Sequence, residues 1–466
     1  MILALAATLA IVVQDQAALR VAPRASAAGL TALWQGDVLE IRGEHAGYVK
    51  VYDHRRERGG YVRGDALRII GLAEADAPEL LAVLRFLRES PGSEVLGISY
   101  GAAYLKAVPS RALSAEPFDA IAVMAERLAD QASGTAPRHG NVAAHLEGVQ
   151  QFGVRMRSFE RNGHMQVCYD GELFRRVLTT AGAHTEERAR AALALTRADC
   201  IDPTLGPSQR AALDEGRHLL LEGIDERGLS ETTRSRLHAR RATVWSSIAY
   251  ERARRHESAT SAAQSALAEL TAVHPDDLGD RRAEYLDAVV RVGASRWAAA
   301  PAAPQTGPLR LTATAGEPGQ TCIALEAGVQ PGTTPLVRRC TYGIVWMASA
   351  QPIGAGRALV LAVQPLESWR ELWVFHESSA AWRVDVVAPG LDDPEEGYVE
   401  FAGFAPGTAR LLIAREVKEG GRFRRRFEEL RLTDLALIRQ ASSPEILADF
   451  GRWQDVNWRR DTLTLH

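Results

Sequence analysis

Two alternating segments, Val38-Leu-Glu-Ile-Arg42 and Tyr48-Val-Lys-Val-Tyr52, decide how the beginning of this chain folds. Apolar and polar residues alternate in both, which is the two-residue period of a half-buried strand. The stretch between them, residues 43–47, begins and ends with glycine and therefore predicts a turn. Several short strands with glycine turns, continuing to residue 70, favour a small β-barrel over residues 17–70.

Four motifs in this region resemble, in the same order, those of bacterial SH3 (SH3b) domains. Tyr48 and Tyr61 stand where the family usually has Trp, and the turn from His54 to Arg58 is longer and more charged. The motifs are Ala18-Leu-Arg-Val-Ala-Pro-Arg-Ala-Ser26, Gln35-Gly-Asp-Val-Leu-Glu-Ile41, Gly47-Tyr-Val-Lys-Val51, and Gly60-Tyr-Val62 with Ala66-Leu67.

The resemblance implies a fold and a kind of contact, but no catalysis. Members of the family are binding modules outside the cytoplasm, often for cell-wall peptide or another protein, and exposed aromatic side chains commonly make the contact. On this basis we expect Tyr48, Tyr52 and Tyr61 to contact the ligand.

The first apolar run, Ile2 to Val13, has two interpretations. It is too short to span a bilayer, which takes about 20 residues, and it has the length of the apolar part of a signal peptide. No Lys or Arg precedes the run, and the best cleavage positions lie near Ala17 or Ala18. We predict a signal peptide over residues 1–16 and hence a periplasmic or secreted protein; the alternative is a buried first strand.

The four cysteines, Cys168, Cys200, Cys322 and Cys340, fit an oxidising compartment. No C-x-x-C pair occurs, which argues against a zinc site or a thioredoxin-like site. Four cysteines allow three pairings. We expect Cys168–Cys200 and Cys322–Cys340, because each pair closes a short loop within one predicted domain; free buried thiols are the alternative.

Beyond residue 70 the pattern changes from strands to helices and back to strands. Residues 75–297 carry helical periodicity, interrupted by one hairpin at Asn162-Gly163. A Pro/Ala linker follows at residues 298–308. Residues 309–466 then show two sets of four short strands, which begin at Gly343 and Gly397.

These segments predict a multidomain α+β protein. Its parts are a small SH3-like β-barrel, a mainly α-helical domain with one β-hairpin, and an antiparallel β domain. The two strand sets of the last part suit either propeller-like meanders or a sandwich.

Composition excludes some partners. The formal net charge is -3, so no basic field would attract nucleic acid. No segment is apolar enough to make this an integral membrane protein. His139 and His145 with Glu147 match no zinc-binding spacing, so we predict no metal and no cofactor.

The sharpest catalytic motif is Gly97-Ile-Ser-Tyr-Gly101, which matches the G-x-S-x-G of a nucleophile elbow. Such an elbow follows strands of a parallel sheet, and too few residues separate this motif from the predicted barrel to build one. The sequence therefore favours a non-enzymatic exported protein of the cell envelope that binds wall peptide or a protein partner. The alternative is a serine hydrolase with Ser99 as nucleophile.

Overall fold

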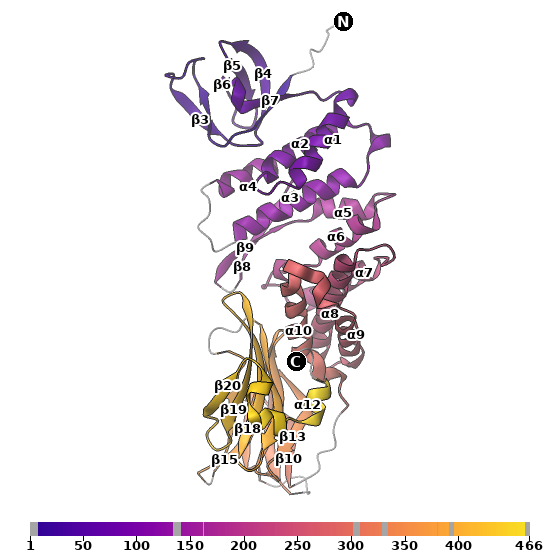
Figure 1. Ribbon diagram of the computed structural model, residues 1–466, viewed down its shortest axis with the longest axis vertical. Coiled ribbons are helices and arrows are strands. Elements are labelled where there is room, and N and C mark those ends of the chain that lie inside the picture. Colours follow the sequence, from indigo (N-terminus) through magenta and orange to yellow (C-terminus); the bar gives the residue numbers. More distant parts are fainter. Residues whose placement is uncertain are drawn as a thin grey trace. The chain divides into compact units, whose positions relative to one another are not determined.

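The computed structural model describes residues 8–133, 141–161, 163–301, 308–328, 334–379, 381–390 and 396–461. The chain is mixed α/β with several antiparallel sheets, as predicted (Figure 1). It forms two compact units: unit 1 is Met1–Leu205 with Ile224–Leu229, and unit 2 is Gly206–Gly223 with Ser230–His466. The later helices thus belong with the β domain. Six residues of the predicted linker, 302–307, lie outside the described part.

Unit 1 begins with a seven-stranded sheet in the order β3-β2-β6-β5-β4-β1-β7. Its inner face packs around Leu19, Leu39 and Val51. No pairing joins β3 to β7 among the described residues, so the sheet stays open and the prediction of a closed barrel is wrong in this respect. The strands are β1 (Leu9–Val12), β2 (Ala17–Arg20), β3 (Gly29–Leu33), β4 (Val38–His45), β5 (Tyr48–Asp53), β6 (Arg58–Arg63) and β7 (Leu67–Ile70).

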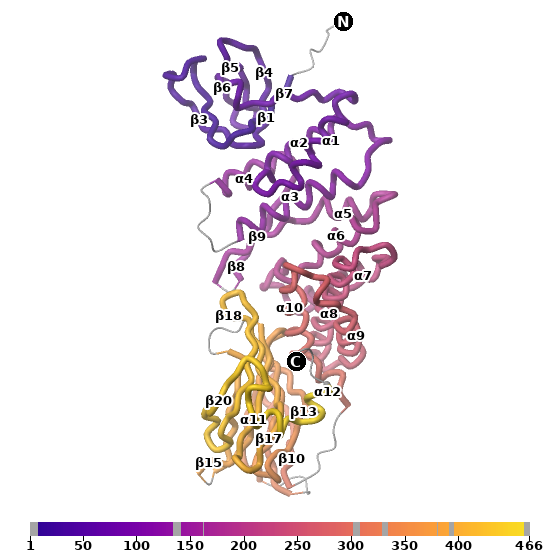
Figure 2. The backbone as a smooth tube through the Cα atoms, viewed as in Figure 1, coloured from indigo at the N-terminus to yellow at the C-terminus, as the bar shows by residue number. Residues whose placement is uncertain are grey.

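Strand β1 explains why the sheet is open. It comes from the apolar run predicted as a signal peptide and lies between β4 and β7 (Figure 2). Ala10 and Val12 pack into the sheet's core, whereas Ile11 packs against the first two helices. The edge of the sheet is therefore covered by helices instead of pairing with β3.

The described part of the first apolar run thus adopts the alternative, a buried strand. The signal peptide over residues 1–16 stays a prediction, although its removal would take β1 out of both cores. Burial of Ala10, Ile11 and Val12, all at 0% exposure, contributes on the order of 5 kcal/mol.

Six α-helices, α1 to α6, and one hairpin complete unit 1 beside short helical turns in the described residues. The predicted helical periodicity is seen in α1, where apolar residues recur at helical spacing and Leu80, Leu84 and Leu87 are buried. The elements are α1 (Ala77–Arg88), α2 (Glu94–Ala107), α3 (Glu116–Ser133), α4 (Val142–Gln150), β8 (Met156–Arg161), β9 (His164–Tyr169), α5 (Glu172–Thr179) and α6 (Thr185–Leu195). Of the predicted hairpin turn, Asn162 lies outside the described residues.

Unit 2 combines helices with two sheets. Its helices are α7 (Pro207–Glu222), α8 (Glu231–Arg254), α9 (Thr260–Thr271), α10 (Arg282–Ser295), α11 (Ala448–Trp453) and α12 (Val456–Asp461). The small sheet consists of β10 (Leu309–Ala315), β11 (Thr321–Ala327) and β12 (Val337–Thr341).

The large sheet contains both predicted strand sets. They are β13 (Ile344–Ile353), β14 (Ala358–Leu366), β15 (Trp369–Ser378) and β16 (Ala381–Val387), then β17 (Gly397–Ala405), β18 (Arg410–Glu419), β19 (Arg422–Arg431) and β20 (Leu437–Ala441). A short parallel pairing of β15 with β17 joins the two sets into one sheet. Strands β10 and β11 pack on β14 and β15 through Leu311, Ile323, Leu361 and Phe375. Two packed sheets are the arrangement of a sandwich and not of separate propeller blades.

Both predicted disulfides are present. Cys168 of β9 bonds to Cys200, which follows α6, and Cys322 of β11 bonds to its cross-strand partner Cys340. They close loops of 32 and 18 residues. In the chain-entropy view each stabilises the fold by about 3 kcal/mol.

Candidate functional site

The three predicted contact residues lie on one face of the unit 1 sheet. Strand β5 alternates, so that Val49 and Val51 point into the core while Tyr48, Lys50 and Tyr52 point outward. Tyr61 of β6 lies directly across from Lys50. We call Tyr48, Lys50, Tyr52 and Tyr61 the β5–β6 face; its tyrosines are partly exposed and its lysine is exposed.

Two neighbouring side chains contact the ring of Tyr52. The Arg42 guanidinium carbon lies 4.0 Å from the ring centre, which is a cation–π distance. His54 meets the ring edge at 4.9 Å. Glu40 in turn binds both neighbours, since its Oε2 lies 3.2 Å from the Arg42 guanidinium and 2.7 Å from the His54 Nε2. The hydrogen bond from Arg42, and then that from His54, lowers the pKa of Glu40, which stays ionised.

Lys50 lies at the centre of the face and has no such partner. No ion pair or hydrogen bond of its ammonium occurs within the described residues. Gly43, its neighbour in β4, leaves the side open, since even a Cβ there would meet nothing within 4 Å. Sequence reasoning missed Lys50 and Arg42. The signal was available, because the strand period places Lys50 on the same face as Tyr48 and Tyr52.

In the charged turn after β5, His54 lies against Tyr52, whereas Arg55 and Arg56 turn away from the β5–β6 face. Arg55 binds Asp37 at 3.0 Å and Glu147 of α4 at 3.4 Å, and Arg56 binds Asp37 at 2.9 Å and Asp53 at 2.7 Å. Both aspartates are almost fully buried. The longer turn therefore fastens the sheet to the helices and does not widen the β5–β6 face.

Ser99 does not occupy a nucleophile elbow. It lies in the middle of α2, is 1% exposed, and its Oγ lies 2.7 Å from the Gly36 carbonyl and 2.9 Å from the Val95 carbonyl. A Cβ at Gly97 would overlap Met124, and one at Gly101 would overlap Ile121. The two glycines let α3 approach α2 closely, so helix packing explains the motif, and Ser99 lies within a helix and not at the strand-to-helix turn that a nucleophile elbow requires.

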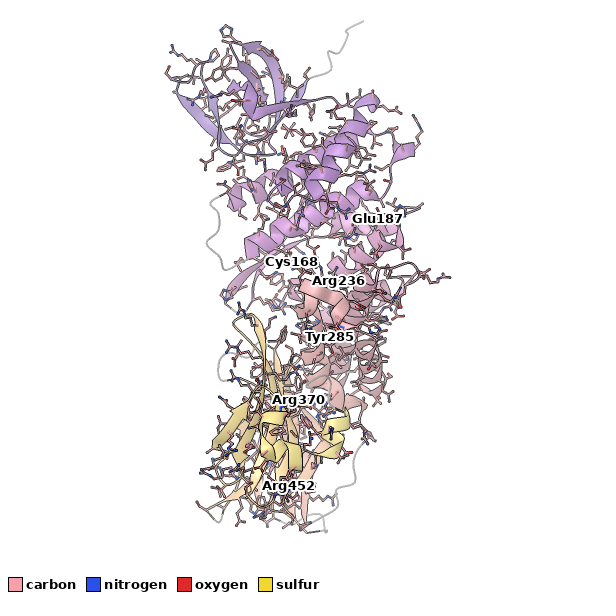
Figure 3. All side chains as sticks on the ribbon, in the orientation of Figure 1. Cys168, Glu187, Arg236, Tyr285, Arg370 and Arg452 are labelled. Atoms are coloured by element: carbon pink, nitrogen blue, oxygen red, sulfur yellow. A yellow bond between two sulfur atoms is a disulfide. The ribbon has the colours of Figure 1, made fainter. Side chains whose placement is uncertain are left out.

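Unit 2 contains a buried ionic network between its helices and the large sheet. Arg370, 0% exposed, donates to the backbone carbonyls of Gly293 and Val399 and to Glu400 at 2.8 Å (Figure 3). Arg291 of α10 likewise binds Glu396 at 2.5 Å. A buried pair of this kind adds little net stability compared with apolar residues, but loss of one partner is costly because it leaves the other charge buried and unpaired.

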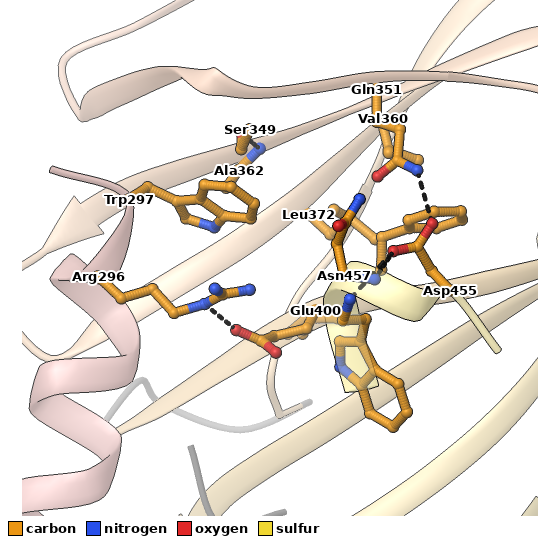
Figure 4. A pocket seen from close by; sticks show the side chains of 13 residues that line it. Arg296, Trp297, Ser349, Gln351, Val360, Ala362, Leu372, Glu400, Asp455 and Asn457 are labelled. Carbon is orange, nitrogen blue, oxygen red and sulfur yellow. Dashed lines mark hydrogen bonds and ion pairs between the residues drawn. The ribbon is translucent and has the colours of Figure 1, made fainter. Parts of the chain in front are cut away.

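A small cavity of about 50 Å³ adjoins this network (Figure 4). Arg296 reaches Glu400 across it at 2.6 Å, and Gln351 donates to Asp455 at 3.2 Å. The second carboxylate oxygen of Glu400 is buried without a hydrogen-bond partner among the described residues. The volume suits a few water molecules and lies well below the roughly 300 Å³ of an ordinary ligand pocket.

A wider cleft of about 550 Å³ lies elsewhere in unit 2, between the α8–α9 connection and the start of β13. Trp297, Tyr342 and Trp346 line it. Two further lining residues, Arg254 and Glu257, carry opposite charges. Tyr342 is 59% exposed and donates a hydrogen bond to Glu317. The cleft is therefore the second candidate binding site, besides the β5–β6 face.

Three comparisons bear on the identity of the chain. No family model matches it, no curated protein matches it, and no solved structure matches it. The likeness to SH3b domains therefore stays a prediction from the quoted motifs. Among the described helices, none is long and apolar enough to cross a bilayer.

Proposed function

We propose that this chain is an exported, non-enzymatic protein of the cell envelope that binds cell-wall peptide through an SH3b-like module at residues 17–70. The observation that carries the proposal is the β5–β6 face. Three tyrosines and an uncommitted lysine share one outward surface, and aromatic rings with a polar end are the side chains that binding surfaces favour.

Two further features support the proposal. The two disulfides are consistent with a periplasmic or extracellular location. The sheet is also fixed on α1, α2 and α4, so the face is preorganised and loses little freedom on binding.

Retention of the purified full chain on isolated cell-wall sacculi tests the proposal. We expect Tyr52→Ala to reduce retention about tenfold, as the loss of an aromatic anchor does at other interfaces. Phe86→Ala is the matched control, because Phe86 is an exposed aromatic of the same unit, 72% accessible, that lies on α1 outside the face. It should leave retention unchanged.

Two results would overturn the proposal. Equal retention of wild type and Tyr52→Ala would remove the face from binding. Loss with Tyr342→Ala but not with Tyr52→Ala would move the site to the unit 2 cleft. If wild type is not retained at all, a protein partner replaces wall peptide as the candidate ligand.

A further inference from the structure

We propose that the β5–β6 face selects peptides by their carboxylate groups, with the Lys50 ammonium as the anchoring cation. This inference rests on the proposed function and adds the chemical class of the ligand. The partner that fits is an extended peptide with an acidic side chain or a free C-terminus.

The first argument is that the other cations of this face are already committed. Arg42 binds Glu40, Arg63 binds Asp65, and Arg20, which pairs with Tyr61 from β2, donates to the Ala27 carbonyl at 2.8 Å. Lys50 alone has an ammonium without an internal acceptor among the described residues. It stands between Tyr48 and Tyr52 along β5, and both tyrosines are partly exposed on the same face. A charge-assisted hydrogen bond is stronger where water is partly excluded.

The second argument is that the face already holds one carboxylate, its own. Glu40 lies directly across from Tyr52, on the same side of the sheet as Lys50 and one strand away. It is a diagonal neighbour of Lys50, about 7 Å away by sheet geometry, and its carboxylate pairs with Arg42 and not with Lys50. Glu40 therefore neutralises Arg42 and leaves Lys50 as the position where a second carboxylate is bound.

The chain offers an unusually direct test, because it has only three lysines, Lys50, Lys106 and Lys418. Reductive methylation of the full chain with ¹³C-formaldehyde keeps their charge and gives each lysine its own methyl signal. Lys106 on α2 is exposed and serves as the internal control. Lys418 is paired with Glu396 at 3.1 Å. The Lys50→Arg variant assigns the Lys50 signal.

The probes are three short peptides: acetyl-Ala-Glu-Ala-amide, acetyl-Ala-Ala-Ala with a free carboxylate, and neutral acetyl-Ala-Gln-Ala-amide. We expect the two anionic peptides to shift the Lys50 signal and leave that of Lys106 in place. The neutral peptide should bind about fivefold more weakly. Comparison of the two anionic peptides shows whether the face prefers a side-chain or a C-terminal carboxylate. Equal shifts by the neutral peptide, or equal shifts at Lys106, would overturn the inference.

Two charge variants should change binding in opposite directions. Glu40→Gln removes the neighbouring carboxylate and frees Arg42 and His54, so anionic peptides should bind about threefold more tightly. Lys50→Gln should reduce retention on sacculi about fivefold, whereas Lys106→Gln should not. If Tyr52→Ala abolishes retention and Lys50→Gln does not change it, the proposed function stands and the carboxylate inference fails.

Discussion

Two regions of this protein contain the same three kinds of side chain, but in different surroundings. In unit 1, Arg42 lies 4.0 Å from the Tyr52 ring and binds Glu40. In unit 2, Arg370 lies 5.2 Å from the Tyr398 ring and binds Glu400. The Arg42 side chain is 44% exposed and that of Arg370 is 0% exposed.

This difference teaches that charge and aromaticity alone do not mark a binding site. The unit 2 group is buried and donates to the backbone of α10 and β17, so a ligand in solution cannot reach it. The unit 1 group lies beside an uncommitted lysine on an open surface. Exposure together with an uncommitted polar group decides which of the two can bind a ligand.

The largest expected effect follows from the buried group. Arg370→Met keeps the volume but leaves Glu400, which is 4% exposed, short of one of its two cationic partners. Removal of one partner from a buried pair lowers the free energy of unfolding by about 4 kcal/mol. Urea unfolding measures this. Arg42→Met is the matched control and should cost less than about 1 kcal/mol. Equal losses of unfolding free energy in the two variants would contradict the contrast between the buried and the exposed group.

A smaller effect, with a defined pH dependence, follows from the carboxylate beside Tyr398. Burial raises the pKa of Glu416 to about 7 from its ordinary 4.5, and its carboxylate accepts a hydrogen bond from the Tyr398 hydroxyl at 3.4 Å. The folded state therefore binds the proton more tightly than the unfolded chain. This contribution to stability is complete below pH 4.5 and is lost as the pH rises through 7.

Glu416→Gln should accordingly raise the free energy of unfolding by about 2 kcal/mol at pH 8 and by less than about 0.5 kcal/mol at pH 5. Urea unfolding at the two pH values measures the difference. The matched variant Glu40→Gln changes an exposed carboxylate whose pKa is lowered by Arg42, so it should not stabilise the protein at pH 8. A pH-independent effect of Glu416→Gln would show that Glu416 is ionised in the fold.

The sequence predicted those elements that local pattern determines. Alternation gave β4, β5 and the eight strands of the large sheet, and apolar spacing gave most helices. Both disulfide pairings were predicted by loop closure and are confirmed. Tyr48, Tyr52 and Tyr61 were chosen from the resemblance to SH3b domains, and all three are partly exposed in the fold.

What the sequence could not predict depends on tertiary contacts. A short apolar run such as Leu9–Val12 suits a signal peptide as well as a strand, and no local signal predicts that Ile11 and Val12 pack into two different cores. The glycines around Ser99 suit a nucleophile elbow as well as a close helix contact. In the fold they allow the close contact between α2 and α3. The parallel pairing of β15 with β17, which joins the two strand sets, has no local signal at all.

Hydrogen–deuterium exchange of the full chain, with and without solubilised wall peptide, tests most directly that the exposed group binds and the buried one does not. We expect added protection in residues 38–63, strongest in the turns that flank β5, and no change around Arg370 or in the cleft at Tyr342. Protection confined to unit 2, with residues 38–63 unchanged, would contradict this account.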